Sequence, residues 1–345
     1  MGTAAVLTGL GAHLPPRRVT NADLAERLDT SDEWIASRTG IRERRWADPG
    51  VSTGDLATEA GLRALKSAGL GDDARIDLVV LATTTPDHPC PATAPEVASR
   101  IGLVDAAAYD LAAVCSGFVY ALEAASNAIR AGRAANALVI GAETYSTILD
   151  HTDRTTAVIF GDGAGAAVLR AGDDTEPGAL TGFDLGSDGT RRDCITVPAG
   201  GSRQRAAGGE PAEADRYFQM RGKEVFTAAV AHMTASARAA AARAGWPLGT
   251  VAHVVGHQAN LRILRAVGEQ LGLDPGTVVS NLDRVGNTSA ASIPLALADA
   301  AAAGRFAAGD RVLLTAFGGG FTWGAAALTW PDLAAVTTDE RSPIR

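Results

Sequence analysis

The feature that most constrains the fold of this 345-residue chain is an alternation of short apolar runs with longer alanine-rich segments. Short apolar runs are typical of buried strands, and the alanine-rich segments have the length of helices, so the alternation predicts an α/β architecture. We expect strands at residues 76–82, 107–114, 137–141, 155–160, 165–169, 251–255 and 277–280, and two more joined by a glycine turn within 312–330. We expect helices at residues 56–68, 119–130, 223–244, 261–271 and 293–303.

The alternation occurs twice, which predicts a chain built from two halves. We place the halves at residues 1–174 and 175–345, although the internal sequence identity between them is weak. A segment rich in Gly, Ala, Glu and Arg at residues 200–216 has no apolar periodicity, so we expect an exposed loop there.

Composition narrows the class of protein. Hydrophobic residues at 46% and charged residues at 20% are ordinary for a soluble globular protein, and the net charge of −8 argues against nucleic-acid binding. Three scattered cysteines are too few for a disulfide framework, which favours a cytoplasmic protein. We expect neither a secretory signal nor a membrane span, because the uncharged stretch at 312–330 is interrupted by three consecutive glycines.

Cys115 lies where a predicted strand gives way to a predicted helix. The amino end of a helix carries free amide groups and a partial positive charge, and both stabilise a thiolate. Most free cysteines, however, are small buried hydrophobic residues, so the position alone leaves both interpretations open.

His257 and Asn287 lie in two further loops that precede predicted helices. Such loops are where α/β folds place functional groups, although either residue could have a purely structural role. Taken with Cys115, they form a nucleophile with two potential hydrogen-bond donors. That set suits the stabilisation of an enolate or an oxyanion.

Three segments that contain these residues resemble the signature sequences of β-ketoacyl-acyl carrier protein synthase III. They are AVCSGF at 113–118, HQANLR at 257–262 and GNTSAAS at 286–292. Further similarity is found at residues 32–42, 160–165 and 316–324, in the order of the family, from near residue 6 to near residue 330. The resemblance implies a thiolase-like five-layered α-β-α-β-α fold of two duplicated halves, and a homodimer.

The resemblance also implies a mechanism. Cys115 matches the nucleophile that acyl-CoA acylates, and His257 and Asn287 match the pair that holds the malonyl thioester during loss of CO2. The amides of Cys115 and Gly319 match the oxyanion hole. Acyl-CoA and malonyl-acyl carrier protein are then substrates that start fatty-acid or polyketide chains, and no metal or other cofactor is needed.

A CoA site is also implied, and one part of it has separate physical support. Residues 30–33 fit a helix capping box, which places Trp34 and Arg38 four residues apart on one helix face, where they could stack an adenine and pair with a phosphate. The resemblance implies that Arg154 is a third residue of this nucleotide site. Gly222 and Asn260 match the lining of the pantetheine tunnel.

The carrier-protein patch and the acyl pocket are implied with departures from the family pattern. Arg262 and Arg265 match basic residues of the patch, whereas Thr227 and residues 269–270 stand where bases are common, so recognition could differ. For the acyl pocket the resemblance indicates Phe160 and Cys90. Cys90 matches a residue that reaches the pocket of the partner subunit, and its small size predicts acceptance of medium or branched acyl groups.

Other readings remain open at this stage. A thiolase would need a second cysteine near the carboxy-terminal glycine turn, where this chain has Phe317, and the elongating synthases use a second histidine where it has Asn287. An acyltransferase that moves the acyl group to an alcohol or amine without condensation is one alternative. A non-catalytic scaffold is the other.

Overall fold

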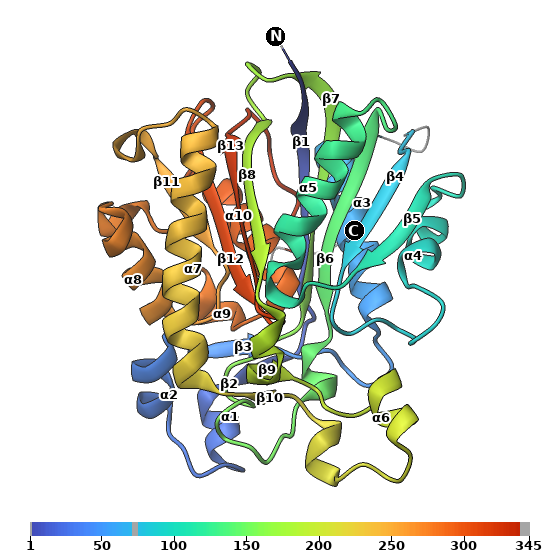
Figure 1. Cartoon of the computed structure of the whole chain (residues 1–345), viewed down its shortest axis with the longest axis vertical. Helices are drawn as coiled ribbons and strands as arrows, with labels where there is room; N and C mark the ends of the chain where they lie inside the picture. The colour runs from blue at the N-terminus through green and yellow to red at the C-terminus, as the bar shows by residue number, and fades with distance from the viewer. Residues whose placement is uncertain (1, 71–74, 339–345) are drawn as a thin grey trace.

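The computed structural model describes residues 2–70 and 75–338, and at its centre is a nine-stranded sheet flanked by helices (Figure 1). The strands of the first half are β1 (Thr3–His13), β4 (Leu78–Ala82), β5 (Ala107–Leu111), β6 (Asn136–Glu143) and β7 (Gly163–Asp173). Those of the second half are β8 (Ala179–Ser187), β11 (His253–Gly256), β12 (Arg311–Gly318) and β13 (Thr322–Thr329). The main helices are α3 (Thr53–Ser67), α4 (Ala94–Ile101), α5 (Gly117–Arg130), α7 (Gly222–Arg243), α8 (Leu261–Leu271) and α10 (Ser292–Ala302).

The strand order shows that both halves have the same topology. The sheet runs β5-β4-β6-β7-β1, which is the third, second, fourth, fifth and first strand of the first half. The second half runs β11-β12-β13-β8, and a single parallel bridge from Val278 to Val254 of β11 takes the place of its third strand. The halves meet where β1 and β8 pair antiparallel over two residue pairs. The boundary proposed at residue 174 falls between β7 and β8 and stays a prediction.

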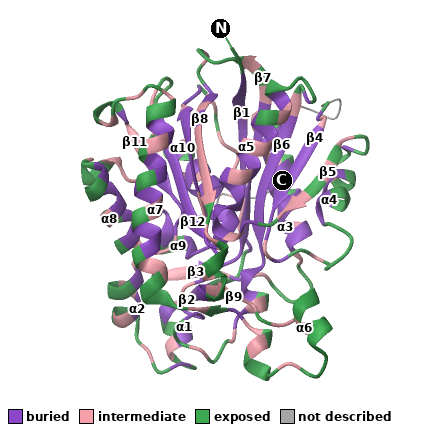
Figure 2. Cartoon of the chain, viewed as in Figure 1, coloured by how far each residue is buried: buried purple, intermediate pink, exposed green. Residues whose placement is uncertain are grey.

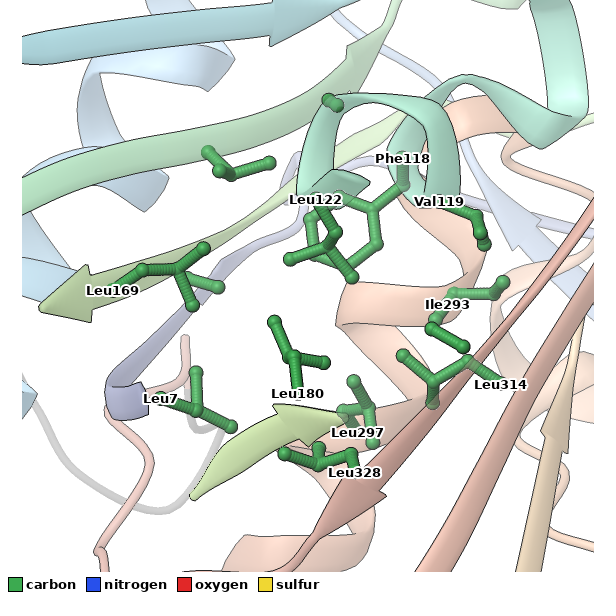
Figure 3. Close-up of a cluster of buried hydrophobic side chains, with 14 of the residues drawn as sticks. Leu7, Phe118, Val119, Leu122, Leu169, Leu180, Ile293, Leu297, Leu314 and Leu328 are labelled. Atoms are coloured by element: carbon green, nitrogen blue, oxygen red, sulfur yellow. The ribbon is translucent and has the colours of Figure 1, made fainter. Parts of the chain in front are cut away.

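Helices form three layers around the two halves of the sheet. Helices α5 and α10 lie between the halves, and eight of the 11 residues of α10 are buried, as expected for a helix packed on all sides. Figure 3 shows Phe118 and Leu122 of α5 and Ile293 and Leu297 of α10 in one apolar cluster with Leu314 of β12. Helices α3 and α4 pack on the other face of the first half, and α7 and α8 on that of the second. The result is the expected five-layered α-β-α-β-α fold.

Burial follows these layers. In Figure 2 the strands are mostly buried, whereas α7 and α8 alternate buried and exposed residues because one face of each packs on the sheet. Among residues 2–70 and 75–338, no helix combines the length and the apolar character needed to cross a bilayer.

Smaller elements gather at the lower end of the molecule in Figure 1. They are β2 (Arg18–Thr20), β3 (Glu43–Arg45), β9 (Ile195–Thr196), β10 (Gln219–Met220), α1 (Asn21–Ala25), α2 (Asp32–Thr39) and α6 (Ser202–Ala207). The strands pair as β2 with β3 and β9 with β10. A one-turn helix, α9 (Leu282–Val285), contacts β3 and precedes the turn that holds Asn287.

Two of the expected strands are wrong. Residues 155–159 form turns and Phe160 makes only an isolated bridge, because the Asp153 carboxylate accepts hydrogen bonds from the Thr155 and Thr156 hydroxyls and stabilises a turn in place of a strand ladder. Residues 277–280 contribute only the bridge at Val278, since Pro275 begins a short 3-10 turn that bends the chain.

Three local expectations also need correction. The strand expected at residues 107–114 ends at Leu111, and Val114–Ser116 form a 3-10 turn. Helix α2 is capped by Ser31 alone, whose Oγ accepts from the Trp34 amide at 3.1 Å, and not by a reciprocal capping box. The segment at 200–216 is exposed as expected, but it contains α6 and a 3-10 turn at Glu213–Arg216.

Candidate active site

Cys115 lies on a strained turn between β5 and α5. Val114 has a φ of 48°, a left-handed conformation that branched side chains rarely adopt, and Ser116 closes the turn by donating its amide and hydroxyl to the Ala113 carbonyl at 3.2 and 2.8 Å. The thiol is buried, with the residue 7% exposed. The turn therefore fixes the sulfur at the first residues of α5.

The glycine turn between β12 and β13 packs directly against this turn. A Cβ atom on Gly318 would lie 2.8 Å from the Cys115 nitrogen and 3.0 Å from the Ser116 nitrogen, so only glycine fits there. The neighbouring Gly319 amide has no hydrogen-bond acceptor among the described residues. Its amide is thus free to bind a ligand.

His257 follows β11, and hydrogen bonds fix both its backbone and its side chain. Its backbone amide donates to the Thr315 carbonyl of β12 at 2.8 Å, and its Nδ1 lies 2.7 Å from the Ser292 Oγ at the start of α10. The residue is 2% exposed, and burial lowers the pKa of the imidazole to about 3. The ring is therefore neutral at physiological pH, with Nε2 as its remaining nitrogen.

Asn287 lies in the turn that leads into α10. Its backbone amide donates to the Ile159 carbonyl, its carbonyl accepts from the Gly161 amide, and both distances are 2.9 Å. The Oδ1 atom accepts from the Ser289 amide at 2.9 Å, which leaves the Nδ2 group as the donor. The bridge to Phe160 thus joins the first half of the chain to this turn.

The charge state of Cys115 differs from the expectation. The pKa of the thiol is raised to about 12, chiefly by burial and also by the nearby Glu143, although the Ser289 hydroxyl and the amide of Cys115 lower it. Burial thus outweighs the effect of the helix start, and the resting residue is a protonated thiol.

The three residues expected at a nucleotide site are together on the surface near α2. The guanidinium carbons of Arg38 and Arg154 each lie 5.5 Å from the centre of the Trp34 ring. Arg154 also donates to the carbonyl of Asp29 at 2.7 Å, which holds the guanidinium in place. An aromatic ring between two cations suits a nucleotide.

Helix α8 connects this surface to α7. Asn260 caps α8 by accepting from the Arg262 amide at 2.8 Å, and its Nδ2 donates to the Arg38 carbonyl at 3.0 Å. The Arg262 guanidinium lies 5.6 Å from the centre of the Phe226 ring of α7, one turn after Gly222. Arg262 and Arg265 are both exposed.

An aromatic cluster lies behind Cys115. Phe160 stacks on Tyr145 with ring centres 4.4 Å apart and meets Phe218 edge-on at 5.0 Å, and all three are buried. Tyr145 is close enough to Cys115 for the thiol to raise the pKa of its phenol, after the larger effect of burial. Cys90 is exposed on the loop between β4 and α4 and belongs to none of the buried clusters.

Known proteins resemble this chain over nearly all its length. Residues 109–189 match the family described as 3-oxoacyl-[acyl-carrier-protein (ACP)] synthase III, and residues 241–330 match its C-terminal part. The β-ketoacyl-[acyl-carrier-protein] synthase III 5 of Streptomyces coelicolor is 63% identical over 97% of this chain and 100% of its own. The chain belongs to the β-ketoacyl-acyl carrier protein synthase III family.

Solved structures of synthase III proteins share the fold. The enzyme from Pseudomonas aeruginosa superposes with a TM-score of 0.89 at 51% identity, covering 96% of this chain and 99% of its own. A priming β-ketosynthase from a polyketide biosynthetic pathway has a TM-score of 0.88 at 35% identity, covering 95% and 97%. The five-layered arrangement is thus the thiolase-type fold of this family.

Sequence reasoning assigned no role to several residues near Cys115 and His257 of this synthase III chain. They are Glu143, Tyr145, Ser289 and Ser292. Glu143 could have been found, because a carboxyl at the end of an apolar strand is unusual. Among the described residues, no group of three or more His, Cys, Asp or Glu could hold a metal ion.

Proposed function

We propose that this chain is a β-ketoacyl-acyl carrier protein synthase III that forms an acyl thioester on Cys115 and condenses it with malonyl-acyl carrier protein. The observation that carries the proposal is the strained turn that holds Cys115 against the glycine turn of β12 and β13, beside two available backbone amides. That arrangement suits a nucleophile whose acyl group develops negative charge on oxygen.

In the first half-reaction, the Cys115 sulfur attacks the carbonyl carbon of acyl-CoA. The amides of Cys115 and Gly319 stabilise the oxyanion, the bond from carbon to the CoA sulfur breaks, and the thiol proton of Cys115 is transferred to the departing CoA thiolate. Trp34, Arg38 and Arg154 hold the nucleotide, and Gly222 and Asn260 line the path of the pantetheine.

In the second half-reaction, malonyl-acyl carrier protein loses CO2 and leaves an enolate that attacks the acyl carbon on Cys115. As the new carbon–carbon bond forms, the bond from that carbon to the Cys115 sulfur breaks, and the released thiolate takes up a proton from water. His257 and Asn287 hold the enolate oxygen by donating from Nε2 and Nδ2. The neutral imidazole suits this role, because its Nδ1 can accept from the Ser292 hydroxyl while Nε2 carries the proton.

The partners follow from the surface of the chain. Arg262 and Arg265 on α8 form a basic patch for the acidic carrier protein. Strand β5 is at the edge of the sheet and carries the exposed Tyr109, which suits pairing with a second copy in a homodimer. Three free cysteines favour a reducing cytoplasm.

The first experiment measures the mass of the intact protein after incubation with a panel of acyl-CoAs. We expect one acyl adduct per chain, mapped by peptide analysis to Cys115, with Cys90 and Cys194 free. Cys194→Ala is the matched control, since it removes another buried thiol and should still be acylated. An adduct that persists in Cys115→Ala would contradict the mechanism.

A second experiment separates condensation from simple acyl transfer. Asn287→Ala should be acylated nearly normally but should lose about 10²–10³-fold in condensation with malonyl-acyl carrier protein, as is usual when one donor to an oxyanion is removed. Release of CO2 from the malonyl group reports the second step. Acyl transfer without CO2 release would favour an acyltransferase, and no adduct at all would favour a scaffold.

A further inference from the structure

Arg44, the central residue of β3, is a buried cation that the proposed reaction does not use. The residue is 0% exposed, and no carboxylate of the described residues lies within ion-pair distance of its guanidinium. Burial lowers its pKa to about 10, so the group still carries a positive charge at neutral pH. Burying a charge without a partner of opposite sign is costly, which indicates a specific role for this side chain.

Three oxygen atoms accept hydrogen bonds from the Arg44 guanidinium. Its Nη1 donates to the Val19 carbonyl at 3.1 Å and to the Asn21 Oδ1 at 2.8 Å, and its Nη2 donates to the Val158 carbonyl at 2.6 Å. Asn21 is itself buried, and its Nδ2 donates to the Asp32 carboxylate at 2.8 Å. The guanidinium is therefore fixed on one side by the amino-terminal segment, and on the other side it holds the carbonyl of Val158.

The residues that follow Val158 are bonded to the turn that carries Asn287. The Asn287 amide donates to the Ile159 carbonyl, and the Gly161 amide donates to the Asn287 carbonyl, each at 2.9 Å. Both backbone groups of Asn287 are thus bonded to the segment 158–161. The position of this segment therefore determines the position of Asn287.

The same segment is bonded to β3 and its end at the alternate residues. Val158 accepts from Arg44, and the Phe160 carbonyl accepts from the Trp46 Nε1 at 3.1 Å. Strand β3 also lies beside α9, the one-turn helix before the Asn287 turn (Figure 1). The segment 158–161 therefore lies between β3 on one side and Asn287 on the other.

The stem of the Arg44 side chain packs where both neighbouring segments have glycine. A Cβ atom on Gly161 would lie 3.1 Å from the Arg44 Cβ, and one on Gly286 would lie 3.0 Å from the same atom. Gly286 directly precedes Asn287, and its φ of 68° is a conformation that favours glycine. A shift of Arg44 would thus be transmitted to both segments that hold Asn287.

We propose that Arg44 is a positioning residue that holds the Val158 carbonyl and thereby places Asn287 so that its Nδ2 can donate to the enolate oxygen. The proposal rests on the role of Asn287 in condensation proposed above. Acylation uses the amides of Cys115 and Gly319, which take no part in these hydrogen bonds. Arg44 should therefore act on the second half-reaction and not on the first.

The test starts from protein that is fully acylated on Cys115, as verified by intact mass, and is then mixed with malonyl-acyl carrier protein. Arg44→Met removes the charge and the hydrogen bonds but keeps an unbranched side chain. Its rate of CO2 release should fall about 10–100-fold, because a small misplacement of a donor is enough for such a loss. Acylation by saturating acyl-CoA should stay close to that of the wild type. Arg44→Lys keeps the charge and a donor, so it should recover part of the lost rate.

A double variant distinguishes positioning through Asn287 from a general structural role. Because Arg44 acts through Asn287, the double variant Arg44→Met with Asn287→Ala should condense as slowly as Asn287→Ala alone. Losses that multiply would show that the two residues act independently, and they would overturn the proposal. Normal condensation by Arg44→Met, or an equal fall in both half-reactions, would overturn it as well.

Leu138→Ala is the stability control. Leu138 of β6 is also 0% exposed, but it belongs to a cluster that contains none of the residues around Arg44 or Asn287. The variant should unfold at a lower temperature without changing the ratio of condensation to acylation. A change of this ratio as large as that of Arg44→Met would contradict the positioning role.

Two further outcomes are informative. If Arg44→Met does not fold, Asn21→Ala removes one acceptor of Nη1 and leaves the guanidinium in place, so it should show the same selective loss to a smaller degree, and equal losses in both half-reactions would overturn the proposal. Normal CO2 release by Asn287→Ala would refute the role of Asn287 and this proposal with it. Slow release by Asn287→Ala with normal release by Arg44→Met would overturn this inference alone.

Discussion

At the scale of single residues, the proposed active site contains groups that reduce the stability of the fold. Val114 and Ser289 both have positive φ values, and each such conformation costs about 1–3 kcal/mol. His257 is buried in a form that cannot accept a proton at moderate pH. These unfavourable conformations are found in and near the turns that position Cys115, Asn287 and the imidazole of His257. The proposed active site therefore reduces the unfolding free energy of the chain.

The buried His257 predicts a loss of stability in mild acid. Its pKa is about 3 in the folded chain and about 6.5 unfolded, so only the unfolded chain binds a proton in the window between these values. Its contribution is complete above pH 6.5 and is lost as the pH falls towards 3. Between pH 7 and 5 we expect the wild type to lose about 2 kcal/mol more of its unfolding free energy than His257→Gln, measured by urea titration. Equal losses in both proteins would contradict the neutral buried ring.

At the scale of elements, the glycine turn of β12 and β13 lies in close contact with the turn before α5. Gly318→Ala would place a methyl group 2.8 Å from the Cys115 nitrogen, so one of the two turns must move. We expect a loss of about 1–3 kcal/mol in stability and a large loss of acylation, measured by thermal unfolding and intact mass. Gly249→Ala is the control, because nothing lies within 4 Å of its added methyl group, and it should change neither.

A second prediction concerns nucleotide binding at helix α2, where two arginines lie over the Trp34 ring. Trp34→Ala should raise the KM for acyl-CoA about tenfold, because stacking of a base on an aromatic ring contributes about 1–3 kcal/mol. An acyl-pantetheine substrate without the nucleotide should show no change. Trp246→Ala is the matched control, since Arg311 lies over that ring at the same 5.5 Å far from the proposed site. A similar KM effect in both variants would argue against a nucleotide site at Trp34.

These elements also show how far the sequence alone can predict this structure. Helix α8 was predicted at its observed bounds, because an asparagine cap, an apolar periodicity and a terminal glycine are local signals. The strand expected at 155–160 was wrong, since hydrogen bonds to Asp153 favour turns. The catalytic candidates were found from their signatures, but Glu143, Tyr145 and the raised pKa of Cys115 depend on burial by distant segments, which no local pattern records.

At the scale of the whole molecule, the two halves have the same strand order, but the second half lacks one full strand at its edge. The first half ends in the full strand β5, whereas the second half has only the bridge at Val278. The edge formed by the full strand β5 carries the exposed side chain of Tyr109, and this edge suits pairing with a second subunit. The exposed position of Cys90 on the loop after β4 agrees with a residue that acts across such an interface.

The assembly prediction concerns the acyl group. Cys90 is flanked by two prolines, which stiffen its loop, and its small side chain should leave room beside the partner's aromatic cluster. Each buried methylene contributes about 0.8 kcal/mol, so we expect medium or branched acyl-CoAs to have higher kcat/KM than acetyl-CoA. Cys90→Phe should reverse the preference, and Cys90→Ala should not. A dimer by analytical ultracentrifugation is required, and a strong preference of the wild type for acetyl-CoA would contradict the prediction.

The position of β1 has a consequence for synthesis on the ribosome. This strand begins at Thr3 and lies in the middle of the sheet, between β7 and β8, so its partners are made more than 150 residues later. At a translation rate of about 5–20 residues per second, an apolar amino-terminal strand waits roughly ten seconds or longer without its neighbours. Contacts of such long sequence separation also slow folding. The nascent chain therefore exposes the apolar strand β1 before its partner strands have been synthesised. We expect chaperones to bind β1 before residue 187, the end of β8, has left the ribosome.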